Sequence, residues 1–221
     1  MKIKIEMTYR TPKGTESTFQ SEVMNPEKAL LLAEDLAKTG RIKDMTFYDN
    51  HDTTWMLKEL KRYVEDIDSE PHNVVVFFDG GFDVATKSSG LGCVIYFEQN
   101  GKQLRLRKNA LVEELQTNSE AEYAALYLAI QALEDLGVHH LPVTFTGDSQ
   151  GVINQMSDEW PCYEEDLLRW IDKIEGKLMK LGITPEFTLV SRKRNKEADH
   201  LATQALNGVE ILSQSEINRA E

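Results

Sequence analysis

Residues 74–83 read VVVFFDGGFD and join a run of apolar residues to an aspartate and two glycines. A run of this kind, without an alternating polar face, is typical of a strand that is covered on both sides. Gly80 and Gly81 favour an end to that strand, so we expect Asp79 at the mouth of a sheet. Taken alone, Asp79 has a simpler explanation, since an Asp before Gly often starts a turn by bonding its own backbone.

The pattern that follows predicts three hairpin-linked strands and then helices alternating with strands. The expected strands are 74–79, 92–98, 102–109, 143–147 and 186–191, and the expected helices are 120–136, 149–157, 163–181 and 195–207. This order favours an α/β fold with a mixed five-stranded sheet and helices on both faces. Ligands of such sheets gather at strand ends.

A domain boundary is expected within residues 66–73, DIDSEPHN, where an acidic helix end meets a proline and then the apolar strand. Upstream, two alternating strands, a helix over 25–40 with Asn25 as its cap, a third strand and a second helix predict a small α+β domain over 1–70. The larger domain spans 72–208, and 209–221 is expected to be a C-terminal tail. The sequence does not indicate a role for residues 1–70, and binding of a protein partner is one possibility.

Composition restricts the class of protein. The 221 residues carry a formal charge of −12 and are 41% hydrophobic, so the chain can form a core but has no general basic field that attracts nucleic acid or an anionic membrane. Cys93 and Cys162 lie far apart and outside any zinc-like spacing, which predicts reduced packing residues. The chain contains no run of about 18 apolar residues, as a membrane span would require. We therefore expect a cytoplasmic protein.

Four further acidic residues stand at the ends of expected elements, and each has a local explanation. Asp148 stops the strand VTFTG and suits a helix cap. Glu120 and Glu122 open the helix TNSEAEYAAL, where either suits a capping box with Thr117 or Ser119. Asp199 lies in the first turn of the last helix, where a negative charge complements the helix dipole.

Helical periodicity separates the two glutamates. At 100° per residue, Glu122 shares a stripe with the apolar residues that must rest on the sheet, namely Leu126, Ala129, Ile130 and Leu133. Glu120 lies 200° from Glu122 and should point into water as a capping residue.

Taken together and in this order, DGG, TNSEAEYAAL, GDSQ and NKEADHLA resemble the ribonuclease H family, in particular ribonuclease HI-like catalytic domains. The resemblance covers roughly residues 73–208. It implies that Asp79, Glu122, Asp148 and Asp199 are the metal-binding catalytic residues. It also implies a metal-dependent endoribonuclease that cuts the RNA strand of RNA/DNA hybrids and leaves 5′-phosphate and 3′-hydroxyl ends.

The chemistry of four converging carboxylates agrees with this implication. They would raise one another's pKa values unless cations neutralised them. Oxygen-only ligation suits two Mg²⁺ or Mn²⁺ ions, which can activate water and stabilise a leaving oxygen. Telling RNA from DNA requires contacts to 2′-hydroxyls in a shallow minor groove. The positions that resemble the family's groove-lining residues are Gly80, Gly81, Asn118, Ser149 and Gln150.

Departures from the family's pattern leave a second reading open. Many members have a basic helix or loop, but SDEWPCYEEDLL is acidic, and the loop VSRKRNKEAD contains no histidine. The cations Arg192 and Arg194 offer a basic patch for substrate, although a solvated loop explains them equally well. Residues 1–70 do not match the family's usual hybrid-binding module. The alternative is therefore a ribonuclease H-like binding or protein-interaction module with little or no nuclease activity.

Overall fold

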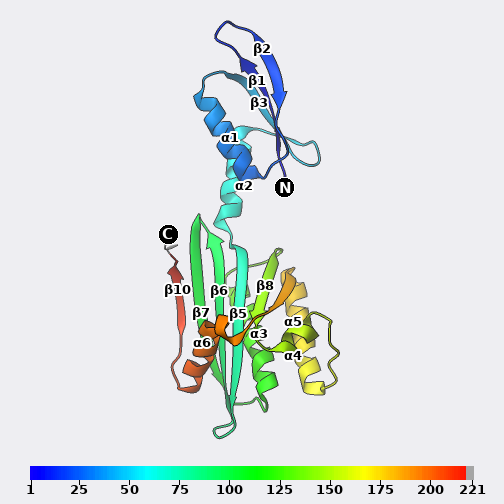
Figure 1. Cartoon of the computed structure of the whole chain (residues 1–221), viewed down its shortest axis with the longest axis vertical. Helices are drawn as coiled ribbons and strands as arrows, with labels where there is room; N and C mark the ends of the chain where they lie inside the picture. Colours follow the sequence, from blue (N-terminus) through cyan, green and yellow to red (C-terminus); the bar gives the residue numbers. More distant parts are fainter. Residues whose placement is uncertain (218–221) are drawn as a thin grey trace. The chain divides into compact units, whose positions relative to one another are not determined.

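The computed structural model describes residues 1–217, and the chain folds into two compact units with the boundary between Ser69 and Glu70. The first unit comprises strands β1 (Lys4–Arg10) and β2 (Glu16–Gln20), helix α1 (Pro26–Lys38), strands β3 (Ile42–Tyr48) and β4 (Thr54–Trp55), and helix α2 (Leu57–Ser69). Its antiparallel sheet has the order β2-β1-β3-β4 (Figure 1).

The first unit forms where the sequence predicts a small α+β domain, although the two-residue strand β4 was not expected. Asn25 caps α1 as predicted, because its Oδ1 accepts a hydrogen bond from the backbone N–H of Lys28 at 2.9 Å. The core is small and consists of Ile3, Ile5, Ala29, Ala33, Phe47 and Leu60. A core of this size gives the unit limited stability of its own.

The second unit contains a six-stranded mixed sheet with the order β10-β7-β6-β5-β8-β9. Its elements are β5 (His72–Asp83), β6 (Ser88–Gln99), β7 (Lys102–Val112), α3 (Asn118–Asp135), β8 (Pro142–Gly147), α4 (Gln150–Met156), α5 (Glu165–Leu181), β9 (Thr184–Leu189), the 3₁₀ helix η1 (Arg192–Arg194), α6 (Lys196–Leu206) and β10 (Leu212–Glu216). β5 pairs antiparallel with β6 and parallel with β8. The predicted α/β class is confirmed.

Two details of the sheet differ from the prediction. β5 does not end at Asp79 but continues through Gly80 and Gly81 to Asp83, because this whole segment stays paired with β6. Part of the expected tail forms β10, which pairs antiparallel with β7 and makes the sheet six-stranded instead of five-stranded. The sequence LSQSE lacks an apolar face, so its strand character depends on this pairing.

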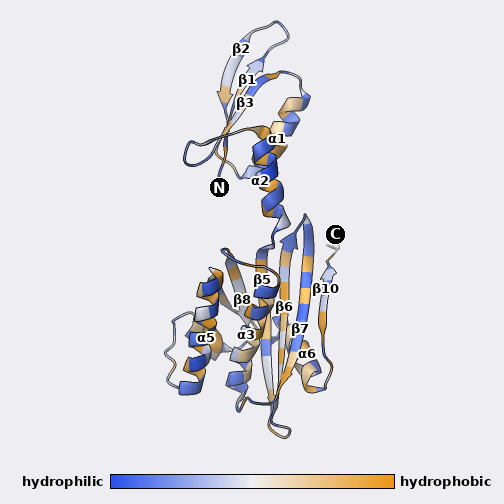
Figure 2. Ribbon diagram, turned by 180° about the vertical axis from the view of Figure 1, so that it is seen from behind, coloured by the Kyte–Doolittle hydropathy of each residue, from blue (hydrophilic) through white to orange (hydrophobic). Residues whose placement is uncertain are grey.

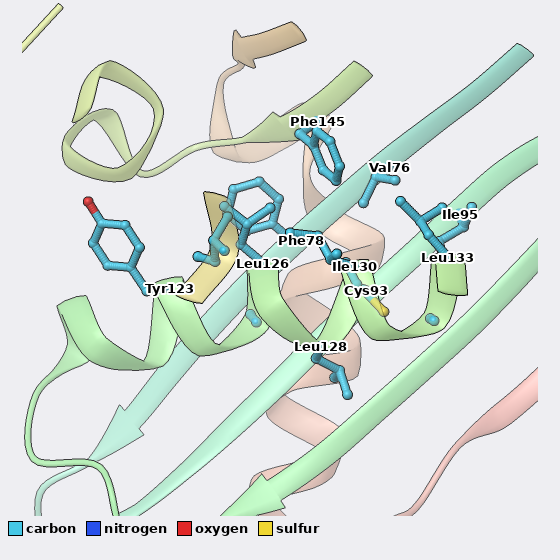
Figure 3. Close-up of a cluster of buried hydrophobic side chains, with 14 of the residues drawn as sticks. Val76, Phe78, Cys93, Ile95, Tyr123, Leu126, Leu128, Ile130, Leu133 and Phe145 are labelled. Carbon is cyan, nitrogen blue, oxygen red and sulfur yellow. The ribbon is translucent and has the colours of Figure 1, made fainter. Parts of the chain in front are cut away.

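Helices cover both faces of the sheet. Figures 1 and 2 show α3 on one face and α6 on the other. Leu167, Ile174 and Leu178 of α5 are buried. The main core lies between α3 and the central strands, where Figure 3 shows Phe78, Ile95, Leu126, Ile130 and Phe145. Within residues 1–217, no helix combines the length and the apolar composition that a membrane span needs.

Candidate active site

Asp79 and Asp148 come from neighbouring parallel strands. Phe77 of β5 pairs with Thr146 of β8, so Asp79 and Asp148, each two residues further on, lie next to each other where β8 has ended. The two carboxyl groups lie close enough for the charge of Asp148 to raise the pKa of Asp79. Asp79 is 8% exposed, although it lies within its strand and not at the strand's end. Asp79 therefore lies at the mouth of the sheet because the neighbouring strand β8 ends beside it, whereas its own strand β5 continues.

Glu122 reaches the same place from α3. Its side chain is 9% exposed, and its Oε2 accepts a hydrogen bond from the backbone N–H of Gly80 at 3.4 Å. Gly80 makes this approach possible, because a Cβ at that position would lie 2.2 Å from the carbonyl carbon of Ala121. The position predicted for Glu122 is confirmed, since it is buried beside Gly80, whereas Glu120 is half-buried at the start of α3.

Glu120 has the capping role that the same register predicts. The Thr117 hydroxyl accepts a hydrogen bond from the Glu120 backbone N–H at 3.1 Å, and the Glu120 carboxylate accepts one from the Thr117 backbone N–H at 3.2 Å. The pair is a complete capping box at the start of α3. Glu120 is thus occupied by its own helix and directed away from Asp79.

Asp199 stands in the first turn of α6, and its Oδ1 accepts a hydrogen bond from Nη2 of Arg192 at 2.7 Å. α6 can pack closely on β6 because residue 92 is a glycine. A Cβ at that position would lie 2.4 Å from the carbonyl oxygen of Ala198. The charge of Asp199 acts on Asp79, so this helix contributes to the same acidic cluster. Arg192 is exposed and attached through the loop between β9 and α6.

Burial and mutual repulsion perturb the two most buried acids. Burial, and then the charges of Asp148 and Asp199, raise the pKa of Asp79 to about 7. Burial, and then the charges of Asp79 and Asp148, raise the pKa of Glu122 to about 8. Arg192 opposes both effects from the exposed side. Perturbed acids that share a cluster are typical of functional sites.

The donor set suits hard divalent cations. Asp79, Glu122, Asp148 and Asp199 supply carboxylate oxygens only, as Mg²⁺ and Mn²⁺ prefer, and bound cations would relieve the repulsion that raises the pKa values. In the described part of the chain, no three acidic, histidine or cysteine side chains are already arranged as a metal cage. Arg192 instead holds an oxygen of Asp199, and Asn195 holds an oxygen of Asp148. The four acids therefore fit Mg²⁺ or Mn²⁺ by their chemistry. Asp148 and Asp199 are each engaged by a protein partner, Asn195 and Arg192 respectively.

The predicted substrate-binding positions adjoin these acids in different ways. Gly80 and Gly81 directly follow Asp79 in β5, and Ser149 and Gln150 directly follow Asp148 at the start of α4. Asn118 opens α3, one turn before Glu122, and its Oδ1 accepts a hydrogen bond from the backbone N–H of Phe82 at 3.2 Å.

The two predicted cationic positions, Arg192 and Arg194, behave differently from each other. Arg192 bonds to Asp199, as described above. Arg194 lines a separate cavity of about 340 Å³ with Phe77 and Tyr96. Only Arg192 thus has a contact to the acidic cluster.

Asn195 is the residue that the sequence analysis missed. It is 1% exposed, and its Nδ2 donates hydrogen bonds to Oδ1 of Asp148 at 2.5 Å and to the carbonyl oxygen of Phe78 at 2.9 Å. It lies at the start of the expected last helix, four residues before Asp199, and gave no separate signal.

Known proteins are similar in sequence to this chain. The family described as "Reverse transcriptase-like" matches residues 77–205. An uncharacterized Bacillus subtilis protein, YpeP, is 39% identical over 206 residues, which is 93% of this chain and 91% of that protein. Ribonuclease HI of Halobacterium salinarum is 35% identical over 92 residues, or 41% of this chain and 44% of that enzyme.

Solved structures share its fold. The structure of LC11-RNase H1 in complex with an RNA/DNA hybrid superposes with a TM-score of 0.55 at 27% identity, covering 62% of this chain and 98% of that chain. The RNase H1 structure from Halobacterium salinarum superposes with a TM-score of 0.53 at 27% identity, covering 62% and 98%. The matched family and these structures coincide with the domain that carries the acidic cluster, and the chain therefore belongs to the ribonuclease H family.

Proposed function

We propose that this protein is a metal-dependent endoribonuclease that hydrolyses the RNA strand of RNA/DNA hybrids and leaves 5′-phosphate and 3′-hydroxyl ends. The observation that carries the proposal is a group of interacting acids: Asp79 and Glu122 are buried with raised pKa values, Asp148 acts on both of them, and Asp199 acts on Asp79. Family membership and the hybrid bound to the related LC11 enzyme support the choice of substrate.

In this proposal Asp79, Glu122, Asp148 and Asp199 bind two Mg²⁺ or Mn²⁺ ions. When bound, such ions activate a water molecule and stabilise the leaving 3′ oxygen of a phosphodiester. The protein contributes by holding Asp79 within β5, Glu122 and Asp199 on helices α3 and α6, and Asp148 directly after β8. Its burial of Asp79 and Glu122 also excludes bulk water from the inner side of the cluster.

Recognition of the hybrid falls to the positions beside the acids. The half-buried backbone near Gly81, together with the side chains of Asn118 and Gln150, offers hydrogen bonds to 2′-hydroxyls and sugars. The Asn118 side-chain oxygen Oδ1 accepts a hydrogen bond from the Phe82 backbone N–H, which leaves Nδ2 of Asn118 for substrate. Arg192 and Arg194 supply cationic contacts to phosphate.

A second candidate is a ribonuclease H-like binding or interaction module with little nuclease activity. One observation favours it: Arg192 occupies Asp199, one of the four proposed ligands, at 2.7 Å. A module that had lost metal binding could keep this ion pair permanently. The close relative YpeP, which is uncharacterized, does not decide between the two candidates.

Cleavage of an end-labelled hybrid by the full chain tests the proposal. We expect the RNA strand to be cut in Mg²⁺ or Mn²⁺, with 5′-phosphate and 3′-hydroxyl products, and no cutting of double-stranded DNA. The Asp79→Asn variant keeps the shape of the side chain but removes its charge and should abolish cleavage, which excludes a contaminating nuclease. Binding of the hybrid without any cleavage in either metal would support the interaction module instead.

A further inference from the structure

Asn195 occupies the N-cap position of α6 but does not cap it. An asparagine at this position normally accepts a hydrogen bond from a backbone N–H of the first turn. Here α6 has no side-chain cap bond, and the Asn195 side chain turns into the protein, where it is 1% exposed. The residue is therefore used for something other than the stability of its own helix.

The buried amide connects three segments that carry proposed metal ligands. Its Nδ2 donates to Oδ1 of Asp148 at 2.5 Å and to the carbonyl oxygen of Phe78, the residue before Asp79, at 2.9 Å. Asn195 itself lies one helical turn before Asp199. The amide orientation is fixed by its partners, because both are acceptors and the opposite orientation would place Oδ1 against two other oxygens.

This arrangement is unfavourable for stability alone. Oδ1 of Asn195 is buried and has no hydrogen-bond partner within the described residues. A buried acceptor without a partner disfavours the folded state, and the unused cap adds to that cost. Such a compromise is expected where a contact serves function and not only folding.

The chemistry of the contact indicates which function it serves. Asp148 faces the repulsion of Asp79, which would otherwise turn the carboxylate outward. A neutral amide donor holds one oxygen of Asp148 in place without cancelling its negative charge, whereas a lysine or arginine would neutralise the carboxylate. The second oxygen of Asp148 stays available to a cation.

The geometry points to Asn195 as a positioning residue that orients Asp148 for binding of divalent cations. Asn195 acts through Asp148 and touches neither substrate nor the reacting atoms. The inference rests on the proposed function, because it requires that Asp148 is a metal ligand. Residues that hydrogen-bond to metal ligands typically change metal affinity by about 10-fold to 100-fold when they are replaced.

Asn109 offers a matched control. It is also buried, at 5% exposed, and its Nδ2 donates to the carbonyl oxygens of Leu201 in α6 at 3.0 Å and of Val209 at 2.9 Å. Its Oδ1 accepts from the backbone N–H of Ile211 at 2.7 Å, so all of its bonds secure α6 and the segment after it. Asn109→Ala should therefore lower the melting temperature without affecting Asp148.

The test compares Asn195→Ser, Asn195→Ala and Asn109→Ala in the full chain. Serine is as good an N-cap as asparagine but is too short to reach both acceptors, so Asn195→Ser should keep the melting temperature of the metal-free protein. Titration with Mn²⁺ followed by electron paramagnetic resonance gives the affinity without any reaction. We expect both Asn195 variants to weaken Mn²⁺ binding by about 10-fold or more. Their kcat on the hybrid should fall while KM changes by less than about 2-fold.

Three outcomes would overturn the inference. Parental Mn²⁺ affinity in both Asn195 variants would refute it and leave the proposed function intact. An equal loss of affinity in Asn109→Ala would show that the effect comes from α6 stability and not from Asp148. If the unaltered protein binds no Mn²⁺ and cuts no hybrid, the proposed function fails and the inference fails with it.

Discussion

Replacing Gly80 by alanine should inactivate the site by displacing a helix. The added Cβ would lie 2.2 Å from both the carbonyl carbon and the oxygen of Ala121 and 2.5 Å from the backbone nitrogen of Glu122. These are backbone atoms at the start of α3, so no side-chain rotation relieves the clash. Ordinary contact begins near 3.4 Å, and the helix must therefore retreat by roughly 1 Å.

The size of the effect follows from that displacement. Overpacking of this kind costs roughly 1–3 kcal/mol of the free energy of unfolding. A shift of about 1 Å in Glu122 relative to Asp79 should reduce kcat on an RNA/DNA hybrid by about 100-fold. Urea denaturation measures the first quantity, and steady-state cleavage in Mg²⁺ measures the second.

Two other glycine variants serve as controls. Gly81→Ala tests stability one residue further on, where the new Cβ would lie at an ordinary 3.6 Å from Cδ1 of Leu206. It should change the free energy of unfolding by less than about 0.5 kcal/mol. Gly176→Ala lies in α5 with open space around its Cβ and should leave kcat unchanged. If Gly80→Ala kept the stability and the kcat of the parent, the role assigned to the close approach of α3 to Gly80 would be refuted.

Four further predictions test the site and the first domain. Glu122→Gln should lower kcat by orders of magnitude with the fold intact, because Glu122 lies in the acidic cluster. Glu120→Gln should leave kcat within a few-fold of the parent, because Glu120 caps its helix. The reverse result would mean that the helical register is wrong. Ca²⁺ should not support cleavage, since its larger and looser coordination shell misplaces the reacting oxygens, and equal rates in Ca²⁺ and Mg²⁺ would exclude the proposed mechanism. Removing residues 1–70 should raise KM more than it lowers kcat. The remaining residues 72–208 contain 13 basic and 20 acidic residues and so attract a polyanion weakly. An unchanged KM would indicate a protein-interaction role for the first domain. With a chelator present, the free energy of unfolding should fall as pH rises from about 4 to 8. The pKa values of Asp79 (about 7) and Glu122 (about 8) lie above their ordinary values, so the folded state binds more protons than the unfolded state across that window. A pH titration of urea unfolding in which Asp79→Asn shows the same slope as the parent would contradict this last prediction.

The sequence was informative wherever a local pattern determines the structure. Periodicity placed Glu122 on the buried face of α3, and capping chemistry placed Asn25 and Glu120 correctly. These features depend on residues within one or two turns of each other, which is the range over which helix signals act. The assignment of the four acids as one set came from the resemblance, and it remains a proposal.

Features that depend on distant partners were not predictable from local pattern. Gly80 and Gly81 suggested a strand end, yet β5 continues because β6 pairs with it along its length. The residue Gly80 serves instead to admit α3, a contact across 41 positions of the chain to Ala121. β10 likewise forms only because β7 presents an edge, and Asn195 finds its two partners in other strands and loops.

The acidity of the site also restricts how a polyanion can approach it. Several cations of the second domain are engaged in ion pairs with the domain's own acids, namely Arg105 with Glu197, Lys108 with Asp135 and Lys177 with Glu134. Arg192 pairs with Asp199 in the cluster itself. Carboxylates left without cations would repel a phosphodiester as well as one another. The carboxylates proposed for catalysis therefore also oppose substrate binding until divalent cations neutralise them, so the apparent affinity for a hybrid should depend on divalent metal even in variants that cannot cleave it.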